Sequence, residues 1–351
     1  MTEAAPGLVA LFGSGETAAS AQAVYEHVFR RLPRPVHVSV LETPAGFELN
    51  SPRVAGRVAD FVREHLPNYA PEVTVIPARK RGTPFSPDNS VILTPLLSAN
   101  AIMFGAGSPT YTVHQLKNSL AWYMLLARHR LGSALVLASA ATIAISAYAL
   151  PVYEIYKVGQ DLHWSEGLDF FGPCGMRLVF IPHWNNSDGG AELDTSRCFM
   201  GQERFDQLVA MLPDGLTIVG IDEHTALIFD LEASACRVMG AGGVTIVRKS
   251  SDLRFLNGQA FPLAELGACR IPSPEEGIPP HVWEQVLTAH RKAESAPTPS
   301  AEVLALVQAR EAARARRDWA AADAMRRQVL DLGWQINDTP QGPQLNPKPS
   351  T

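Results

Sequence analysis

Cysteine is scarce in this sequence, with four residues in a chain of 351, and they stand far apart at positions 174, 198, 236 and 269. No CxxC or HxxxH pair occurs. Zinc sites and disulfide frameworks need closely spaced or more numerous side chains, so neither is indicated. The N-terminus also lacks a basic segment followed by a long apolar one, which argues against a secretory signal. We therefore expect a reduced, cytoplasmic protein that needs no metal or organic cofactor.

Charged residues are few, at 19%, and positive charge is not in excess, because 30 Lys and Arg stand against 35 Asp and Glu. The net charge of −5 argues against nucleic-acid binding by the main body of the chain. Hydrophobic residues make up 46%, which excludes a disordered chain. The longest uncharged run, residues 131–153, contains four serine or threonine residues and a proline, so it fits a buried strand and helix better than a membrane span.

The first 250 residues alternate short apolar runs with amphipathic stretches, which is typical of βαβ units around a mostly parallel sheet. The loops that follow parallel strands share one edge of the sheet, where we look for chemistry. The expected strands are Gly7–Phe12, Val36–Leu41, Val73–Pro77, Ala101–Phe104, Ala134–Leu137, Leu178–Ile181, Leu216–Ile221, Ala226–Asp230, Cys236–Met239 and Val244–Arg248. The expected helices are Ala18–Arg31, Val54–Leu66, Tyr111–Arg128 and Arg204–Met211.

The composition changes near residue 270. Residues 1–270 are predicted to form one domain, 271–300 a Pro-rich flexible linker, and 301–345 a small helical module. In that module we expect helices Ala301–Ala315 and Trp319–Leu332, with Asp318 capping the second and Gly333 ending it. An extended piece, Trp334–Asn337, and a turn over Pro340–Gly342 should follow, with frayed residues after them.

The sharpest chemical signal is the segment LVLASAAT, residues 135–142. A buried strand runs directly into Ser139, and Ala-rich residues that can begin a helix follow it. A serine on such a turn has its hydroxyl exposed at the edge of the sheet, where main-chain amides can hold an oxyanion. The alternative interpretation is a buried serine in a packing segment.

A nucleophilic serine needs a base, and the base needs an orienting acid. His183 follows an apolar strand and precedes a Gly-rich turn, on the same predicted edge as Ser139. His114, His163 and His224 are competitors. Glu154, 15 residues after the serine, is a possible orienting carboxylate, although a solvated charge is the simpler interpretation.

Two Gly-rich loops follow strands at the same edge. FGAGSPTYTVHQL, residues 104–116, could complete an oxyanion hole with its amides. FGSGETA, residues 12–18, satisfies GxGxxA, and Glu42 ends the next strand. That is the outline of a dinucleotide-binding motif, an alternative that Pro44 makes awkward.

Taken in order, these segments resemble the peptidase E and cyanophycinase family of serine peptidases, over about residues 5–250. GSGET (13–17), GAGSPTYTVHQL (105–116), ASAAT (138–142), IPHWNN (181–186), GIDEHTAL (220–227) and RVMGAGGVTI (237–246) each match a family segment. The resemblance implies a class I glutamine amidotransferase-like fold, a three-layer αβα sandwich with a mostly parallel sheet.

The resemblance also implies roles for individual residues. Ser139 would be the nucleophile, His183 the general base and Glu154 the third member, while Gly107 and Ala140 would supply oxyanion amides. No such role is implied for Asp222 and Glu223, which we expect to close a turn. Ser108 and Asn185, in two of the matching segments, are expected to contact substrate.

The family prefers acidic residues at the cleaved position, for which Arg79, Lys80 and Arg81 could supply positive charge. A different reading of the same three residues is a solvated loop. The serine turn reads SAAT where the family has SAGA, so a catalytically degenerate relative that only binds a ligand remains an alternative.

The tail carries a second resemblance. Residues 305–342 are similar to the C-terminal extension of bacterial cysteinyl-tRNA synthetases, with Arg310, Asp318, Trp319, Gly333 and Asp338 among the residues in register. HIGH and KMSKS motifs are absent, so aminoacylation is not expected. Residues 301–330 contain six arginines and four acidic residues. This excess of positive charge allows contact with tRNA or another RNA. The alternative is that the charges form ion pairs within the hairpin. We predict a Ser-His-Glu hydrolase acting on a peptide or isopeptide bond, or a degenerate relative that binds RNA through this tail.

Overall fold

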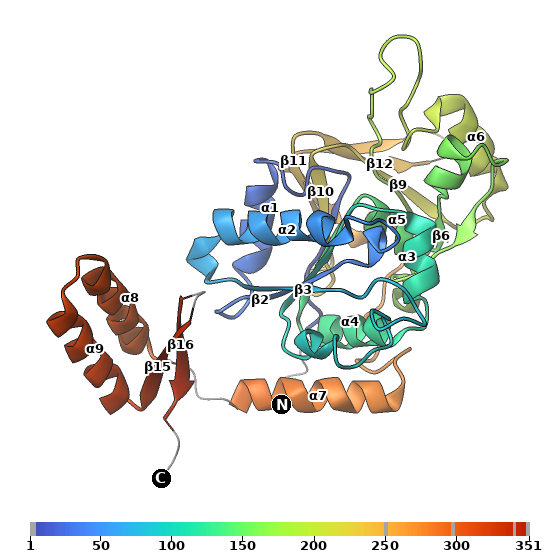
Figure 1. Ribbon diagram of the computed structural model, residues 1–351. Helices are drawn as coiled ribbons and strands as arrows, with labels where there is room; N and C mark the ends of the chain where they lie inside the picture. The colour runs from blue at the N-terminus through green and yellow to red at the C-terminus, as the bar shows by residue number, and fades with distance from the viewer. Residues whose placement is uncertain (1–4, 249–251, 296–298, 340–341, 349–351) are drawn as a thin grey trace. The chain divides into compact units, whose positions relative to one another are not determined.

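The computed structural model describes residues 5–248, 252–295, 299–339 and 342–348, and divides into two compact units, Met1–His290 and Arg291–Thr351 (Figure 1). We refer to them as the main unit and the C-terminal unit. Within the described residues, no helix is both long and apolar enough to cross a membrane.

An eight-stranded sheet forms the centre of the main unit, in the order β14-β11-β10-β1-β5-β4-β2-β3. The five strands from β1 to β3 in that order pair in parallel, and β10, β11 and β14 add an antiparallel edge. The bounds are β1 Val9–Phe12, β2 His37–Leu41, β3 Glu72–Ile76, β4 Ala101–Phe104, β5 Ala134–Ala138, β10 Thr225–Asp230, β11 Ala235–Gly240 and β14 Ala260–Pro262.

Both faces of this sheet are covered by helices. In β1 the side chains alternate, so that Val9 and Leu11 join one buried cluster while Ala10 and Phe12 join another. Helices α1 (Ala21–Phe29) and α2 (Ser51–His65) contribute to the second cluster. Helices α3 (Pro109–Leu116), α4 (Leu120–Arg130), α5 (Ala140–Ala144) and α7 (Pro280–Ser295) contribute to the first. The expected α/β class with a mostly parallel sheet between helical layers is confirmed.

A second sheet of four strands, in the order β13-β12-β9-β8, extends the main unit beside α6 (Gly201–Met211). Its strands are β8 Leu178–Ile181, β9 Thr217–Ile221, β12 Gly243–Val247 and β13 Leu253–Leu256. Strands β8 and β9 are parallel, whereas β12 pairs antiparallel with both β9 and β13. A short hairpin joins β6 (Tyr148–Ala149) to β7 (Ser165–Glu166).

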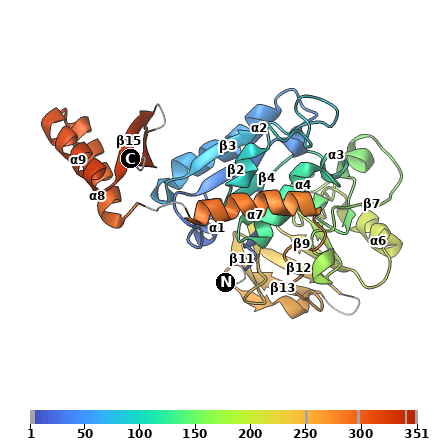
Figure 2. The ribbon, with the colours of Figure 1, turned by 90° about the horizontal axis from the view of Figure 1, so that it is seen from below.

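Two sequence-based predictions need correction. The predicted helix Tyr111–Arg128 is two helices, α3 and α4, because Asn118 has a left-handed φ of 60° and the side chain of Ser119 caps α4. The predicted linker 271–300 contains α7, the long helix seen from below in Figure 2. Val282 and Val286, one helical turn apart, are buried in the core of the main unit.

The C-terminal unit is a helical hairpin followed by a two-stranded sheet. Helices α8 (Ala301–Ala315) and α9 (Trp319–Asp331) pack against each other, and Asp318 caps α9 by accepting from the amide of Ala321. Strands β15 (Trp334–Thr339) and β16 (Gly342–Pro347) are antiparallel. The turn predicted at 340–342 lies partly outside the described residues. Val303, Val329, Trp334 and Ile336 form the core.

Candidate active site

Ser139 stands on a sharp turn between β5 and α5. Its φ of 52° and ψ of −111° lie outside the regions that most residues adopt, and strained backbone of this kind concentrates at functional sites. The turn is anchored to the neighbouring strand β1, because the Ser139 amide donates to the carbonyl of Phe12 at 3.2 Å. The buried hydroxyl of Thr142 contacts that same carbonyl at 2.9 Å and the Leu137 carbonyl at 3.2 Å. These contacts project the Ser139 side chain from the sheet edge.

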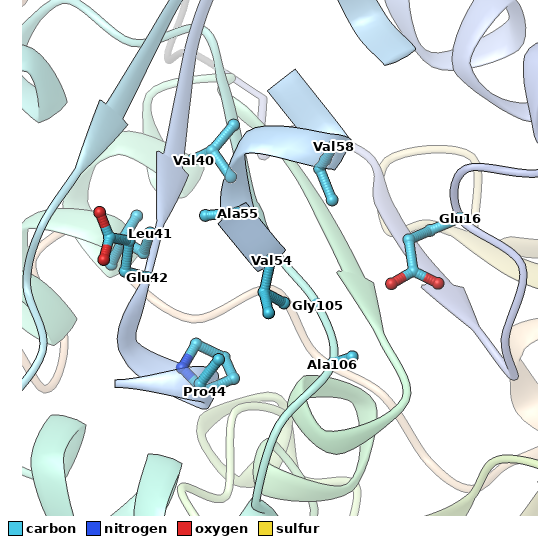
Figure 3. Close-up of a pocket in the computed structure, with 11 residues that line it drawn as sticks. Glu16, Val40, Leu41, Glu42, Pro44, Val54, Ala55, Val58, Gly105 and Ala106 are labelled. Atoms are coloured by element: carbon cyan, nitrogen blue, oxygen red, sulfur yellow. The ribbon is translucent and has the colours of Figure 1, made fainter. Parts of the chain in front are cut away.

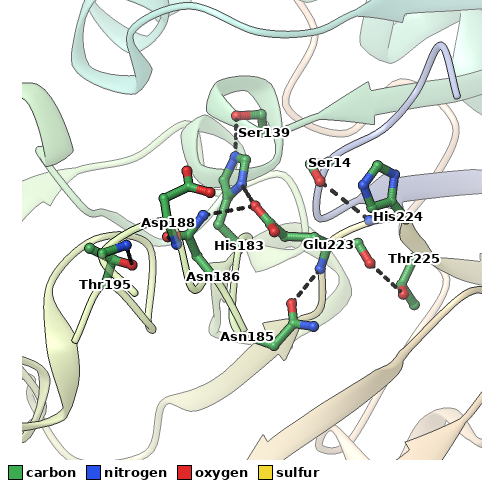
Figure 4. Close-up of polar contacts among 11 residues, drawn as sticks. Ser14, Ser139, His183, Asn185, Asn186, Asp188, Thr195, Glu223, His224 and Thr225 are labelled. Atoms are coloured by element: carbon green, nitrogen blue, oxygen red, sulfur yellow. Dashed lines mark hydrogen bonds and ion pairs between the residues drawn. The ribbon is translucent and has the colours of Figure 1, made fainter. Parts of the chain in front are cut away.

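His183 meets Ser139 across the two sheets. It follows β8, has a left-handed φ of 50°, and its Nε2 lies 3.0 Å from Ser139 Oγ (Figure 4). The imidazole also contacts the ring of Phe199, which is tilted by 46° with its centroid 5.7 Å away. The predicted approach of these two residues therefore appears as a hydrogen-bonded pair of serine and imidazole.

The carboxylate beside His183 belongs to Glu223. His183 Nδ1 lies 2.8 Å from Glu223 Oε1, and the two side chains are 18% and 27% exposed. Glu154, expected in this position from its distance along the chain, lies elsewhere and accepts a hydrogen bond from Thr110. The number of residues between an acid and Ser139 therefore does not determine which acid reaches the imidazole.

The turn that carries Glu223 joins β9 to β10 and is held by its neighbours. Asp222 is buried and accepts from the amide of Gly243 at 2.8 Å and from Arg254 at 2.5 Å. A Cβ at Gly13 would lie 2.1 Å from the Asp222 carbonyl, so only glycine allows the first Gly-rich loop to approach. Asp222 thus closes a turn, as expected, whereas Glu223 takes part in the site. The GIDEHTAL match was the signal that pointed to this segment.

Asn185 and Asn186 position Glu223. Asn185 Oδ1 accepts from the Glu223 amide at 2.8 Å, and Asn186 Nδ2 donates to Glu223 Oε1 at 3.0 Å (Figure 4). Asn185, expected to contact substrate, uses its Oδ1 to hold the main chain of Glu223, and its contact with substrate stays a prediction. The first contact holds the main chain of Glu223, and the second holds the carboxylate oxygen that faces His183.

The Gly-rich loop after β4 begins beside the serine turn, because Phe104 of β4 pairs with Leu137 of β5. Gly107 has a φ of 149°, and a Cβ there would lie 2.0 Å from the carbonyl of Pro44. The next residue, Ser108, donates its amide to that carbonyl at 3.0 Å, and its Oγ caps α3 by accepting from the Tyr111 amide. The loop is therefore held rigidly next to Ser139.

Glu16, from the first Gly-rich loop, lies behind this loop. Figure 3 shows its carboxyl group directed toward Gly105, where a Cβ would lie 2.9 Å from Oε1. Burial raises the pKa of Glu16, while a main-chain hydrogen bond and the charge of His183 act in the opposite direction. The cavity that Glu16 lines has a volume of about 20 Å³, space for roughly one water molecule.

The contacts of Glu42 argue against the alternative that the first Gly-rich loop binds a dinucleotide. This residue is 4% exposed and accepts from Ser51 Oγ at 2.9 Å and from Arg79 Nε at 2.6 Å, so its carboxylate is already occupied. The same ion pair occupies Arg79, one of three residues considered for binding an acidic substrate. Across the described parts of the chain, no three His, Cys, Asp or Glu side chains gather in a way that could hold a metal ion.

The six arginines of the C-terminal hairpin divide into two groups. Arg310 is buried and forms an ion pair with Asp338 at 2.8 Å. Asp338 also accepts from Arg314 at 3.0 Å. Arg326 donates to the Ile336 carbonyl. The remaining three, Arg316, Arg317 and Arg327, are exposed.

Comparison with known proteins finds a different relative for each unit. Residues 296–344 match the family described as cysteinyl-tRNA ligase anticodon binding domain. Cysteine–tRNA ligase of Streptomyces avermitilis is 65% identical over 34 residues, which are 10% of this chain and 7% of the ligase. That of Chlamydia felis is 50% identical over 44 residues, 12% of this chain and 9% of the ligase. The chain thus spans less than a tenth of these relatives.

The crystal structure of a peptidase from an acI-B1 Actinobacterium covers 74% of this chain and 98% of its own, with a TM-score of 0.59 and 19% identity. At this identity the likeness concerns the fold. The expected fold of residues 5–250 and the expected resemblance of the tail are both confirmed. This chain therefore joins a unit with the fold of a peptidase to a segment that matches the anticodon binding domain of cysteinyl-tRNA ligases.

Proposed function

We propose that the main unit is a serine hydrolase that cleaves a peptide or isopeptide bond, with Ser139 as nucleophile, His183 as general base and Glu223 as the acid that orients the imidazole. The observation that carries the proposal is the 3.0 Å contact between Ser139 Oγ and His183 Nε2, made by a serine with a left-handed φ on a strand-to-helix turn. The fold shared with a peptidase agrees with it.

The reaction follows from this geometry. Ser139 Oγ attacks the carbonyl carbon while His183 Nε2 takes the hydroxyl proton, and Glu223 stabilises the imidazolium through Nδ1. The oxygen of the tetrahedral intermediate would be held by the amides of Gly107 and Ala140. His183 then gives its proton to the departing amine, and a water molecule activated by His183 releases the acyl group from Ser139.

The test is covalent labelling with a small aryl fluorophosphonate, followed by intact mass and peptide mapping. We expect one adduct, on Ser139, that is absent in Ser139→Ala and slowed by about a thousandfold or more in His183→Ala. Ser98→Ala, a change at an exposed serine, serves as the matched control and should label like the unmodified protein. Failure of Ser139 to react in the folded protein would overturn the proposal and favour a degenerate relative that binds a ligand without cleaving it.

A second function is proposed for the C-terminal unit, namely contact with tRNA. The match to the anticodon binding domain favours it, as does an exposed aromatic next to exposed positive charge. Trp319 is 58% exposed at the start of α9, and Asp318 separates it from the exposed Arg316 and Arg317. An aromatic side chain beside guanidinium groups can stack on an unpaired base while the charges neutralise phosphates.

Fluorescence anisotropy with unmodified tRNA, using the full chain, tests this second function. Replacing Arg316 and Arg317 together by Ala should weaken binding to tRNA. The slope of log affinity against log salt concentration should also become shallower, by the amount expected for the loss of about two phosphate contacts. Arg57→Ala, a change at an exposed arginine of the main unit, is the control. Binding that the double variant leaves unchanged would refute a role for this face.

A further inference from the structure

A larger cavity, of about 510 Å³, lies between α3 and the helical turn η4 (Tyr153–Lys157). Its lining is aromatic and polar: the rings of Phe47, Tyr111 and Tyr153, the hydroxyls of Ser108 and Thr110, and the carboxylate of Glu154. The volume accommodates one large amino-acid side chain. The serine reaction as proposed above makes no use of this cavity.

Each wall of the cavity is linked to the Ser139–His183 pair through intervening residues. On one side, Ser108 directly follows Gly107, and α3 packs against α5, the helix that begins after Ser139 (Figure 1). On the other side, Tyr156 of η4 contacts the ring of Phe199 with centroids 5.4 Å apart, and Phe199 contacts His183. A substrate whose carbonyl oxygen faces Gly107 would therefore have its nearest side chain, on the acyl side, at the mouth of this cavity.

The hydrogen bonds in the cavity leave Glu154 with unused acceptor capacity. The amide of Tyr111 donates to Ser108 Oγ, so the hydroxyl proton of Ser108 can be donated to Thr110 Oγ1, 3.0 Å away. Thr110 in turn donates to Glu154 Oε1. The other oxygen, Oε2, is buried and has no hydrogen-bond partner among the described residues. An acceptor left in this state is costly, and an N–H donor of a ligand would satisfy it once the carboxylate turns toward the cavity.

The charges around the cavity favour a cation. Among its lining residues there is no lysine or arginine, and His114 is the one basic side chain. The charge of Glu48 lies close enough to raise the pKa of Tyr153, after the larger effect of burial. The ammonium of Lys157 lies 4.5 Å from the centroid of the Tyr153 ring, so this ring already attracts a cation of the chain.

None of the three basic residues considered for an acidic substrate, Arg79, Lys80 and Arg81, lines the cavity. Arg79 contributes its main-chain carbonyl, which accepts from Tyr111 Oη at 2.8 Å. Its guanidinium group pairs with Glu42 and stacks on Phe85. An acidic side chain in the cavity would therefore meet the carboxylate of Glu154 without a compensating guanidinium.

We infer that this cavity receives the side chain on the acyl side of the scissile bond, and that Glu154 selects a cationic side chain, that of arginine or lysine. The aromatic rings would cover its methylene groups and the flat guanidinium, while Glu154 accepts its N–H groups. The inference rests on the proposed serine reaction and specifies the class of its substrates.

The test compares three aryl phosphonate diesters that differ in one side chain, which is guanidino, carboxylate or isobutyl. Each reacts by forming a bond from Ser139 Oγ to phosphorus and releasing a phenol. We expect the guanidino probe to label at least about tenfold faster than the isobutyl probe, and the carboxylate probe to be the slowest. In Glu154→Gln the preference for the guanidino probe should fall about tenfold, with little change for the isobutyl probe. Glu192→Gln, an exposed acid outside the cavity, is the control.

The outcomes separate the two proposals. If no probe, including the fluorophosphonate without a side chain, labels Ser139, the proposed reaction and this inference fall together. If Ser139 is labelled without a preference, or fastest by the carboxylate probe, the selection of a cation is refuted while the serine reaction stands. A preference that survives in Glu154→Gln, with an unchanged melting temperature, would refute the role of Glu154.

Discussion

Replacing Glu223 by glutamine tests which acid supports His183. In the variant, the amide oxygen can occupy the position of Oε1 and still accept from His183 at 2.8 Å and from Asn186 at 3.0 Å. The contact between Asn185 and the Glu223 main chain is unaffected by the change. The principal loss is therefore the negative charge beside the imidazolium that forms during attack.

The size of this loss can be worked out from the geometry. Two unit charges about 4 Å apart attract by about 4 kcal/mol at the effective dielectric constant of partly buried sites. His183 and Glu223 are 18% and 27% exposed, so screening by water reduces this value. A loss of about 3 to 4 kcal/mol in the transition state corresponds to a fall in rate of roughly a hundredfold to a thousandfold.

The assay is the second-order rate of labelling by the fluorophosphonate, measured for Glu223→Gln, Glu154→Gln and the control Glu192→Gln. The melting temperature of each variant shows whether it is folded. We expect only Glu223→Gln to fall by a hundredfold or more with this probe, which carries no side chain. A fall of that size in Glu154→Gln, together with a rate within threefold of the unmodified protein in Glu223→Gln, would refute the assignment of the acid.

Three further predictions concern the support of the site and the C-terminal unit. Gly107→Ala should slow labelling by about a hundredfold, because the new Cβ would lie 2.0 Å from the Pro44 carbonyl and displace an oxyanion amide; labelling at the original rate would contradict this. Thr142→Val should lower the free energy of unfolding by about 1 to 3 kcal/mol in urea titrations, because two buried main-chain carbonyls lose their contact with its hydroxyl, and an unchanged midpoint would speak against it. The hydrogen bond with Arg310 lowers the pKa of Asp338 in the folded protein. This ion pair therefore stabilises the fold fully above the pKa of about 4 that an aspartate has in the unfolded chain, and the stabilisation is lost as the pH falls through the lower pKa of the folded state. Asp338→Asn should therefore speed hydrogen exchange in residues 301–339 of the full chain at pH 7, whereas equal exchange rates would count against the ion pair.

Strands of both sheets could be predicted from the sequence because many of them are buried on both faces. Such strands appear as short continuous apolar runs, and Ala101–Phe104 and Leu178–Ile181 have the predicted bounds. The helices were harder to delimit. Apolar periodicity continues through the break at Asn118, because α3 and α4 both bury side chains in the same core.

Helix α7 was missed for a different reason. Its first residue is Pro280, within a Pro-rich stretch that predicts a linker. Proline is well tolerated in the first turn of a helix, where its missing N–H has no acceptor, so this composition does not exclude a helix. The positions of Val282 and Val286, four residues apart, were the signal of a buried helical face.

At the site, Ser139 and His183 were found because each follows a buried strand, and the topology brings such positions together. The third member could not be found in this way. Glu223 lies on a short turn between β9 and β10, and its contact with His183 depends on how the second sheet sits beside the first. Among the many acids of the chain, only tertiary structure selects the one that reaches Nδ1.

The central claim is that Ser139 is a nucleophile activated by His183, and a crystal structure of the protein after reaction with the fluorophosphonate tests it most directly. We predict phosphorus bonded to Ser139 Oγ, with the phosphoryl oxygen within hydrogen-bond distance of the amides of Gly107 and Ala140 and His183 still contacting Glu223. An unmodified Ser139 alongside an adduct on any other residue would contradict the account.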